Sequence, residues 1–113
     1  MHDDVVKWEE YQLLYQKYFA GAAWNKEAIN ALIDVYGCYK HRFDEPRRHT
    51  GLWRKISNDL ETQNHFYLPE SCDRKMEELI IDYNDETRDL TKTGAKASNW
   101  PYYEKIKNLQ NFC

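Results

Sequence analysis

The sequence predicts an all-α fold. Apolar residues recur at helical spacing in five segments, and no segment alternates apolar and polar residues as a half-exposed strand does. Only 4 Gly and 3 Pro occur among the 113 residues, which argues against a chain rich in loops or disorder. This length fits one domain, and the 15% of aromatic residues can fill its core without the help of disulfides.

The first expected helix runs from Val5 to Phe19 and has a largely aromatic side. About half of its circumference is apolar, through Val5, Trp8, Tyr11, Leu14, Tyr15, Tyr18 and Phe19. Gly21 follows, as it would at the end of a helix. Such a surface needs something to pack on, so this segment is either a core helix of the domain or a partner helix. On the second interpretation, it joins two copies of the chain in a homodimer.

Two further helices are expected on either side of a basic loop. Asn25 can cap the first of them, whose apolar stripe ends at Phe43. Gly37 lies inside that helix, where it weakens helix formation and marks a close helix crossing. Thr50 can cap the next helix. Its apolar residues, which point one way, are Leu52, Trp53, Ile56 and Leu60.

The fourth expected helix, Glu70 to Asp89, has two faces of opposite character and follows a proline that suits a first turn. The inner row, within about one third of the helical wheel, is Cys72, Met76, Leu79, Ile80 and Tyr83. The outer face holds Glu70, Arg74, Glu77, Glu78, Ile81, Asp85 and Arg88. Ile81 is the one apolar residue among these charges. A polar loop is expected from Thr91 to Asn99, and a last helix from Pro101 to Phe112.

The charge of the chain depends strongly on the segment. Overall, 16 basic and 19 acidic residues give a net charge of −3. Residues 40–58 hold six basic residues against two acidic ones, whereas residues 69–90 hold three against eight. Residues 91–113 are basic again, with four lysines against one glutamate. Any attraction to a polyanion should therefore come from the first and last of these segments.

No motif for catalysis or for a tightly bound group is present. The sequence holds no glycine-rich phosphate loop, nucleophile elbow or paired metal-ligand motif. The 3 cysteines are widely spaced, which fits neither a disulfide framework nor zinc, and we expect a half-buried Cys38 and a core Cys72. No apolar run approaches the ~18 residues of a membrane span. We therefore expect no enzyme, cofactor, metal, small-molecule substrate or membrane contact.

The order and spacing of several pieces of sequence are more specific than any one piece. They are WNKEAINALIDVY (Trp24–Tyr36), Phe43, LWRKISNDL (Leu52–Leu60), SCDRKMEELIIDY (Ser71–Tyr83), KTG (Lys92–Gly94) and WPYYEKI (Trp100–Ile106). Together they resemble the Myb/SANT-like DNA-binding domain family, which includes the trihelix factors of plants and the MADF domains of insects.

The resemblance implies an organisation for the whole chain. We expect residues 1–22 to be an N-terminal helical extension, packed on or beside the core. Residues 23–113 should be a Myb/SANT-like domain, with a three-helix core of the helix-turn-helix type and an added C-terminal helix. The chain ends on that last helix, so we expect it to be one domain of a longer protein.

The resemblance also implies a nuclear domain of a transcription or chromatin regulator that binds double-stranded DNA. In such helix-turn-helix variants the third core helix enters the major groove. Carried over to this chain, the reading face falls on Arg74, Glu77, Glu78 and Ile81. The expected DNA-binding residues are Arg47, Arg48, Arg54, Lys55, Arg74, Lys75, Lys92 and Lys96.

The acidic fourth helix also favours a different function. Its net negative charge opposes the approach of DNA. SANT-type members of the wider family use a similar fold to bind histone tails or partner proteins. On this alternative, the chain binds a nuclear or chromatin protein through Glu77, Glu78, Ile81 and Asp85, with little or no DNA binding. The chain's own first helix can instead cover Ile81, and the sequence leaves these interpretations open.

Overall fold

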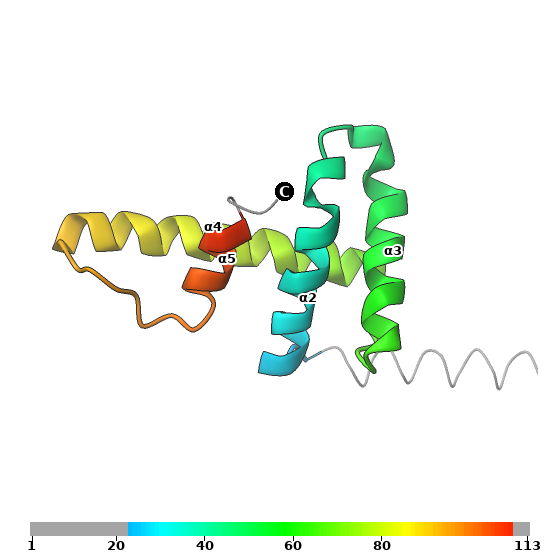
Figure 1. Ribbon diagram of the computed structural model, residues 1–113, viewed down its shortest axis with the longest axis horizontal. Coiled ribbons are helices and arrows are strands. Elements are labelled where there is room, and N and C mark those ends of the chain that lie inside the picture. Colours follow the sequence, from blue (N-terminus) through cyan, green and yellow to red (C-terminus); the bar gives the residue numbers. More distant parts are fainter. Residues whose placement is uncertain (1–22, 110–113) are drawn as a thin grey trace, which may run out of the picture.

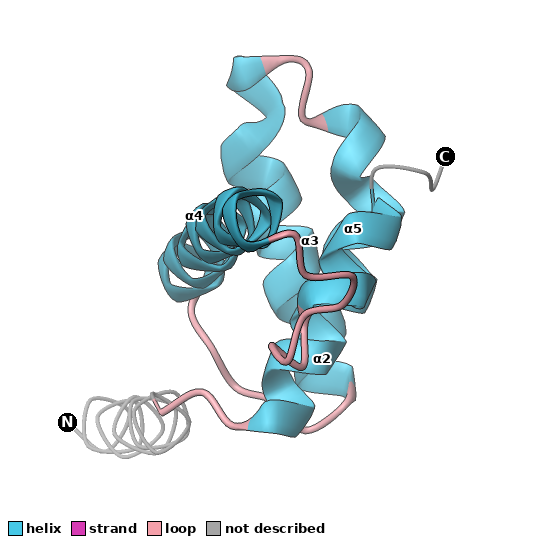
Figure 2. Ribbon diagram, turned by 90° about the vertical axis from the view of Figure 1, so that its left-hand side faces the viewer, coloured by secondary structure: helices cyan, strands magenta, loops and turns pink. Residues whose placement is uncertain are grey.

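The computed structural model describes residues 23–109, and every regular element within them is helical. The elements are α2 (Lys26–Tyr39), η1 (Lys40–Arg42), η2 (Pro46–Arg48), α3 (His49–Thr62), α4 (Pro69–Thr93) and α5 (Tyr103–Leu109). Helices α2 and α3 lie antiparallel, and α4 crosses them (Figures 1 and 2). The expected all-α fold is confirmed. The helix expected over Val5–Phe19, its homodimer contact and the end of the last helix lie outside the described residues.

Helix α2 begins where the sequence predicts and ends earlier. The Asn25 side chain accepts a hydrogen bond from the Ala28 backbone N–H at 2.8 Å and so caps the helix. Regular α-helix stops at Tyr39, and three more residues continue as the tighter 3-10 turn η1. The chain then places the ring of Phe43 5.4 Å from the ring of Tyr36, measured between centroids.

The start of α3 corrects an expectation. Thr50 does not cap this helix, because α3 already begins at His49 and its N-cap residue, Arg48, makes no side-chain capping bond. Pro46 opens the 3-10 turn η2, which runs directly into α3. The threonine is therefore the second residue of the helix and not the residue before it.

Helix α4 is longer than its apolar pattern indicates. It continues past Asp89 to Thr93, and Gly94 then ends it in the left-handed conformation with φ of 70°. The hydroxyls of Thr91 and Thr93 donate to backbone carbonyls four residues earlier, at 2.9 and 3.0 Å. These threonines, expected in a loop, therefore satisfy their polar groups within the helix.

One hydrophobic core joins the four α-helices. It includes Leu32 and Ile33 from α2, Trp53, Ile56 and Leu60 from α3, Cys72, Met76 and Leu79 from α4, and Ile106 and Leu109 from α5. The inner row expected for α4 is thus confirmed at its three buried residues, while Ile80 and Tyr83 are partly buried at the edge of the core. Removal of this apolar surface from water is the main force that holds the helices together.

Aromatic side chains close the core at two ends. The ring of Trp24 stacks on that of Tyr67 at 3.7 Å, and the Tyr67 hydroxyl donates to the Ala23 carbonyl at 3.1 Å. This pair holds the point where the chain enters the fold. At the other end, the rings of Tyr83 and Tyr103 stack at 4.9 Å and so attach α5 to α4.

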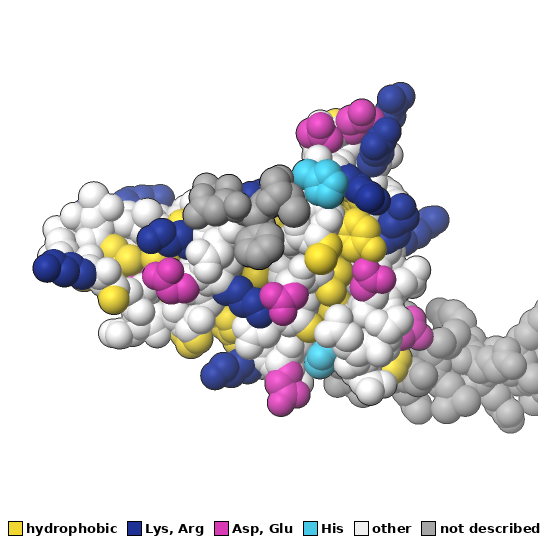
Figure 3. All heavy atoms as spheres, viewed as in Figure 1, with side chains coloured by type: hydrophobic (Ala, Val, Ile, Leu, Met, Phe, Trp, Pro, Cys, Tyr) yellow, Lys and Arg dark blue, Asp and Glu magenta, His cyan; other side chains and the backbone are white. Residues whose placement is uncertain are grey.

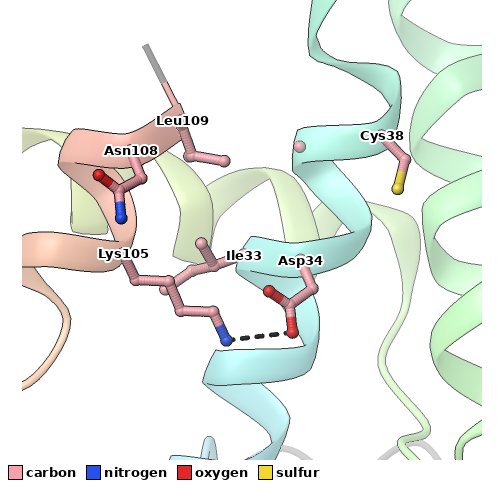
Figure 4. A pocket seen from close by; sticks show the side chains of 7 residues that line it. Ile33, Asp34, Cys38, Lys105, Asn108 and Leu109 are labelled. Atoms are coloured by element: carbon pink, nitrogen blue, oxygen red, sulfur yellow. Dashed lines mark hydrogen bonds and ion pairs between the residues drawn. The ribbon is translucent and has the colours of Figure 1, made fainter. Parts of the chain in front are cut away.

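Helix α5 packs on α2 at its glycine. A Cβ atom at Gly37 would lie only 2.9 Å from Leu109 Cδ2, so the close approach expected at this glycine is confirmed and its partner is α5. Lys105 Nζ reaches Asp34 Oδ2 at 3.0 Å across the small hollow between the two helices (Figure 4). The same ammonium group donates to the Asn30 carbonyl at 3.1 Å.

The two described cysteines differ in environment. Cys72 is completely buried, as expected, and burial raises the pKa of its thiol to about 12. Cys38 lines the hollow beside α5 but is exposed, so the expectation of a half-buried thiol is wrong. Helix α5 covers the neighbouring Gly37 and leaves the cysteine side chain accessible.

A buried hydrogen bond between α3 and the loop before α4 should contribute to stability. Ser57, only 2% exposed, donates to the Tyr67 carbonyl at 2.6 Å. In Ser57→Ala the carbonyl loses this donor, so the free energy of unfolding should fall by about 1–3 kcal/mol in urea denaturation. The matched control is Thr62→Ala, which removes an exposed hydroxyl bond to the Asp59 carbonyl. It should change stability by less than about 0.5 kcal/mol, and equal losses would contradict the prediction.

The thiols should react in sequence. In the folded Cys113→Ser chain, Ellman's reagent should modify Cys38 quickly, because its exposed thiol is accessible to the reagent. Cys72 should react only after the chain is unfolded in guanidinium chloride, because its raised pKa and its burial both suppress reaction. The Cys38→Ser/Cys113→Ser chain is the control and should show no fast thiol. Two thiols that react at one rate in the native chain would show that the core opens around Cys72.

Candidate functional site

Positive charge gathers where α2 gives way to α3. The residues Arg42, Arg47, Arg48 and Lys55, which we call the basic edge, surround a hollow over Gly51 and Leu52. Figure 3 shows lysine and arginine side chains crowded at this end of the molecule, at the upper right. A Cβ atom at Gly51 would meet nothing within 4 Å, so the hollow stays open above the first turns of α3. The N-terminal turn of a helix itself favours anions.

One carboxylate holds two of these arginines. Glu45 Oε2 lies 3.0 Å from Arg48 Nε and 3.5 Å from Arg47 Nε. The two arginine side chains remain 58% and 86% exposed, and ion pairs in such exposed positions contribute little free energy. Both guanidinium groups are therefore oriented by Glu45 and still available to a second, more strongly charged anion.

The structure brings together three of the eight residues predicted to bind DNA, namely Arg47, Arg48 and Lys55. It adds Arg42, which the sequence analysis counted in the basic segment and did not single out. Arg42 lies in η1, with its guanidinium carbon 5.7 Å from the centroid of the Tyr39 ring. Arg42 is close to the arginine pair in sequence, but its place at the same hollow depends on how the chain reverses between α2 and α3, which the sequence pattern does not give.

The other five predicted residues do not join the basic edge. Arg54 is exposed on α3, and Arg74 is exposed on α4. Lys75 pairs with Glu78 at 3.3 Å, and its side chain is only 18% exposed. The exposed Lys92 and Lys96 lie in the last turn of α4 and just after it, at the end that points away from α3 (Figure 1).

The outer face of α4 is exposed along its length, as the helical spacing predicts. Its members Glu70, Arg74, Glu77, Glu78, Ile81, Asp85 and Arg88 are all in contact with solvent. Arg88 pairs with Asp85 at 3.3 Å, which leaves Arg74 as the basic residue of this face with no ion pair to another described residue. The side chain of Ile81 is 53% exposed, an unusual position for a large apolar group.

A groove lies beside Ile81, between α4 and the end of the α2–α3 pair. Its lining, which we call the α4 groove, consists of Tyr36, Phe43, His49, Trp53, Asp73, Met76, Glu77, Ile80 and Ile81. Of the four residues predicted to bind a partner, Glu77 and Ile81 line this groove, whereas Glu78 and Asp85 do not. The aromatic members come from α2, from α3 and from the turn between them, so helical periodicity gave no sign of the groove.

Two further features, a metal-binding cluster and a membrane-spanning helix, are absent from the part of the chain that the structure describes. Residues 23–109 contain no group of three His, Cys, Asp or Glu side chains placed to hold a metal ion. None of their helices is long and apolar enough to cross a membrane.

The comparisons with known proteins agree with the fold. The model of the Myb/SANT-like DNA-binding domain matches residues 21–109, which include all four described α-helices. The chain is also similar to the trihelix transcription factor GT-3b of Arabidopsis thaliana, with 26% identity over 87 residues. That alignment covers 76% of this chain but only 29% of the relative. No solved structure matches. The resemblance drawn from the sequence is confirmed: the chain belongs to the Myb/SANT-like DNA-binding domain family.

Proposed function

We propose that this chain is the domain with which a nuclear transcription regulator binds double-stranded DNA, and that the basic edge makes its main phosphate contacts. The observation that carries the proposal is the gathering of four cationic side chains around one open hollow. Membership of a DNA-binding domain family and similarity to a trihelix transcription factor support it. Such a domain acts by binding and is not an enzyme.

The arrangement of the hollow suits a phosphate group. Arginine is well matched to phosphate because its planar guanidinium group can donate two parallel hydrogen bonds. Gly51 leaves the surface of α3 accessible, and the helix start adds a favourable partial charge. Contacts of this kind supply affinity and orient the duplex, but they do not read its sequence.

Sequence reading is the more demanding part of the proposal. In helix-turn-helix variants the third core helix enters the major groove, and α4 is that helix here. Arg74 lies on its outer face and can donate to the edge of a guanine. Glu77 and Glu78 can accept from cytosine but repel phosphates, so α4 adds selectivity at a cost in affinity.

The remaining basic residues have weaker roles in the proposal. Lys92 and Lys96 lie at the far end of α4, too far along the helix to share the hollow with the basic edge. Their charges attract a polyanion over distance and raise its rate of association. Arg54 on α3 adds to the same field, and Lys75 is largely neutralised by its partner Glu78.

A salt-titrated mobility shift with random duplex DNA tests the basic edge. Arg47→Ala/Arg48→Ala should weaken binding about tenfold or more at low salt. It should also reduce the slope of log affinity against log salt concentration by up to about two, because two fewer phosphates are neutralised. The matched control is Lys26→Ala/Lys107→Ala, which removes the same charge from exposed positions on α2 and α5. Glu45→Gln should act in the opposite direction and strengthen binding, because it removes the carboxylate that competes with phosphate for both arginines.

Two results would contradict the proposal. One is an absence of binding by the unmodified chain at low salt, where electrostatic attraction is strongest. The other is an equal loss of binding in the two double variants, which would mean that overall charge matters and the basic edge does not.

A further inference from the structure

The α4 groove has an apolar floor that the fold leaves open to solvent. The ring of Trp53 lies 5.1 Å from that of Phe43 and 5.8 Å from that of Tyr36. Ile80 and the exposed Ile81 continue this apolar surface on the α4 side, and the accessible lining of the groove is mostly apolar. A connected apolar surface of this kind on a soluble domain is typical of a contact with another molecule.

The floor is held in place by its own contacts. The ring of Phe43 lies 5.1 Å from that of His49, and His49 Nε2 is within hydrogen-bond distance of the Phe43 carbonyl, at 2.6 Å. Met76, almost completely buried, supports the floor from below. A groove that is already formed loses less conformational freedom on binding than a surface that has to rearrange.

The charges around the groove select the occupant. Asp73 and Glu77 are exposed at its edge, and no lysine or arginine lines it. The pKa of Tyr36, in the floor, is raised above its usual value, mainly by burial and also by the Asp73 carboxylate. The negative potential of the edge therefore reaches the floor. His49 is the one lining residue that can carry positive charge, and its ring is engaged with the Phe43 carbonyl. A negatively charged ligand is therefore disfavoured here.

We propose that the α4 groove binds a peptide segment of a partner protein in which a bulky apolar side chain is flanked by lysine or arginine. The apolar side chain packs against Ile81 and the aromatic floor, and the flanking cations pair with Asp73 and Glu77. This division into an apolar centre and a polar rim is that of protein interfaces in general. The site uses none of the basic edge, so the proposal does not depend on the phosphate contacts proposed there, although it shares Glu77 with the face of α4 proposed to read bases.

The experiment uses the full chain and a short synthetic peptide with one leucine between pairs of lysines, labelled with fluorescein. Fluorescence anisotropy should show binding. Two-dimensional spectra of the ¹³C-labelled isoleucine methyl groups should show shifts at Ile80 and Ile81. A peptide with serine in place of leucine, and one with glutamate in place of lysine, should bind much more weakly.

Protein variants separate the apolar and the charged contributions. Ile81→Ser should weaken peptide binding about tenfold or more, which corresponds to the loss of one buried apolar side chain. Leu68→Ser, at the other exposed large apolar residue of the described chain, is its control and should bind normally. Asp73→Asn/Glu77→Gln should weaken binding several-fold at low salt, whereas Asp82→Asn/Asp89→Asn, which removes equal charge outside the groove, should not.

Several outcomes overturn the proposal. The first is a lack of response of the Ile80 and Ile81 methyl signals to the lysine–leucine peptide. This result counts against the proposal even if another part of the chain or a second copy covers the groove. Equal binding of the serine peptide shows that no apolar anchor is recognised. If duplex DNA shifts the Ile81 methyl and the peptide does not, the groove belongs to a DNA interface instead. None of these results depends on the basic edge, so each leaves the DNA proposal standing.

Discussion

The burial of one row of α4 against the α2–α3 pair is the contact on which the rest of the structure depends. Cys72 and Met76 are almost completely removed from solvent and belong to one cluster with Leu32, Ile56 and Leu60. Once that row is buried, the helical period of 3.6 residues also determines which residues lie on the opposite side of α4. Glu77 and Ile81 must then face outward. The hydrophobic core therefore decides which charges the domain shows to its surroundings.

The domain consequently presents two surfaces of opposite sign. Positive charge is concentrated at the short turns between α2 and α3, whereas α4 is negative along its outer face. In the proposed division of labour, phosphate binding belongs to the turns, and recognition of a cationic segment belongs to the groove beside α4. The two hollows share no residue. Glu77, however, belongs both to the α4 groove and to the face proposed to read bases, so a bound peptide should compete with DNA at α4 and not at the basic edge.

Periodicity was sufficient to predict the four described α-helices and most of their buried residues, because it reflects the geometry of a single element. The helix ends were less predictable. Pro46 starts a 3-10 turn that carries the chain into α3 before Thr50, and the threonines up to Thr93 bond back to their own helix. The α4 groove could not be predicted from the sequence, because its floor consists of rings that come together only in the folded chain. Likewise, the sequence identified the basic segment but not the place of Arg42 in it.

The stack of Trp24 on Tyr67, with the hydrogen bond from Tyr67 to the Ala23 carbonyl, has a consequence for whatever precedes the domain. These contacts give the preceding segment a fixed origin on the surface. A tethered segment meets its own domain at an effective concentration set by the length and stiffness of the tether from that origin, which for short links reaches the millimolar range. Anything joined to the chain at that point is therefore presented to the surface of the domain at that concentration, however dilute the protein is.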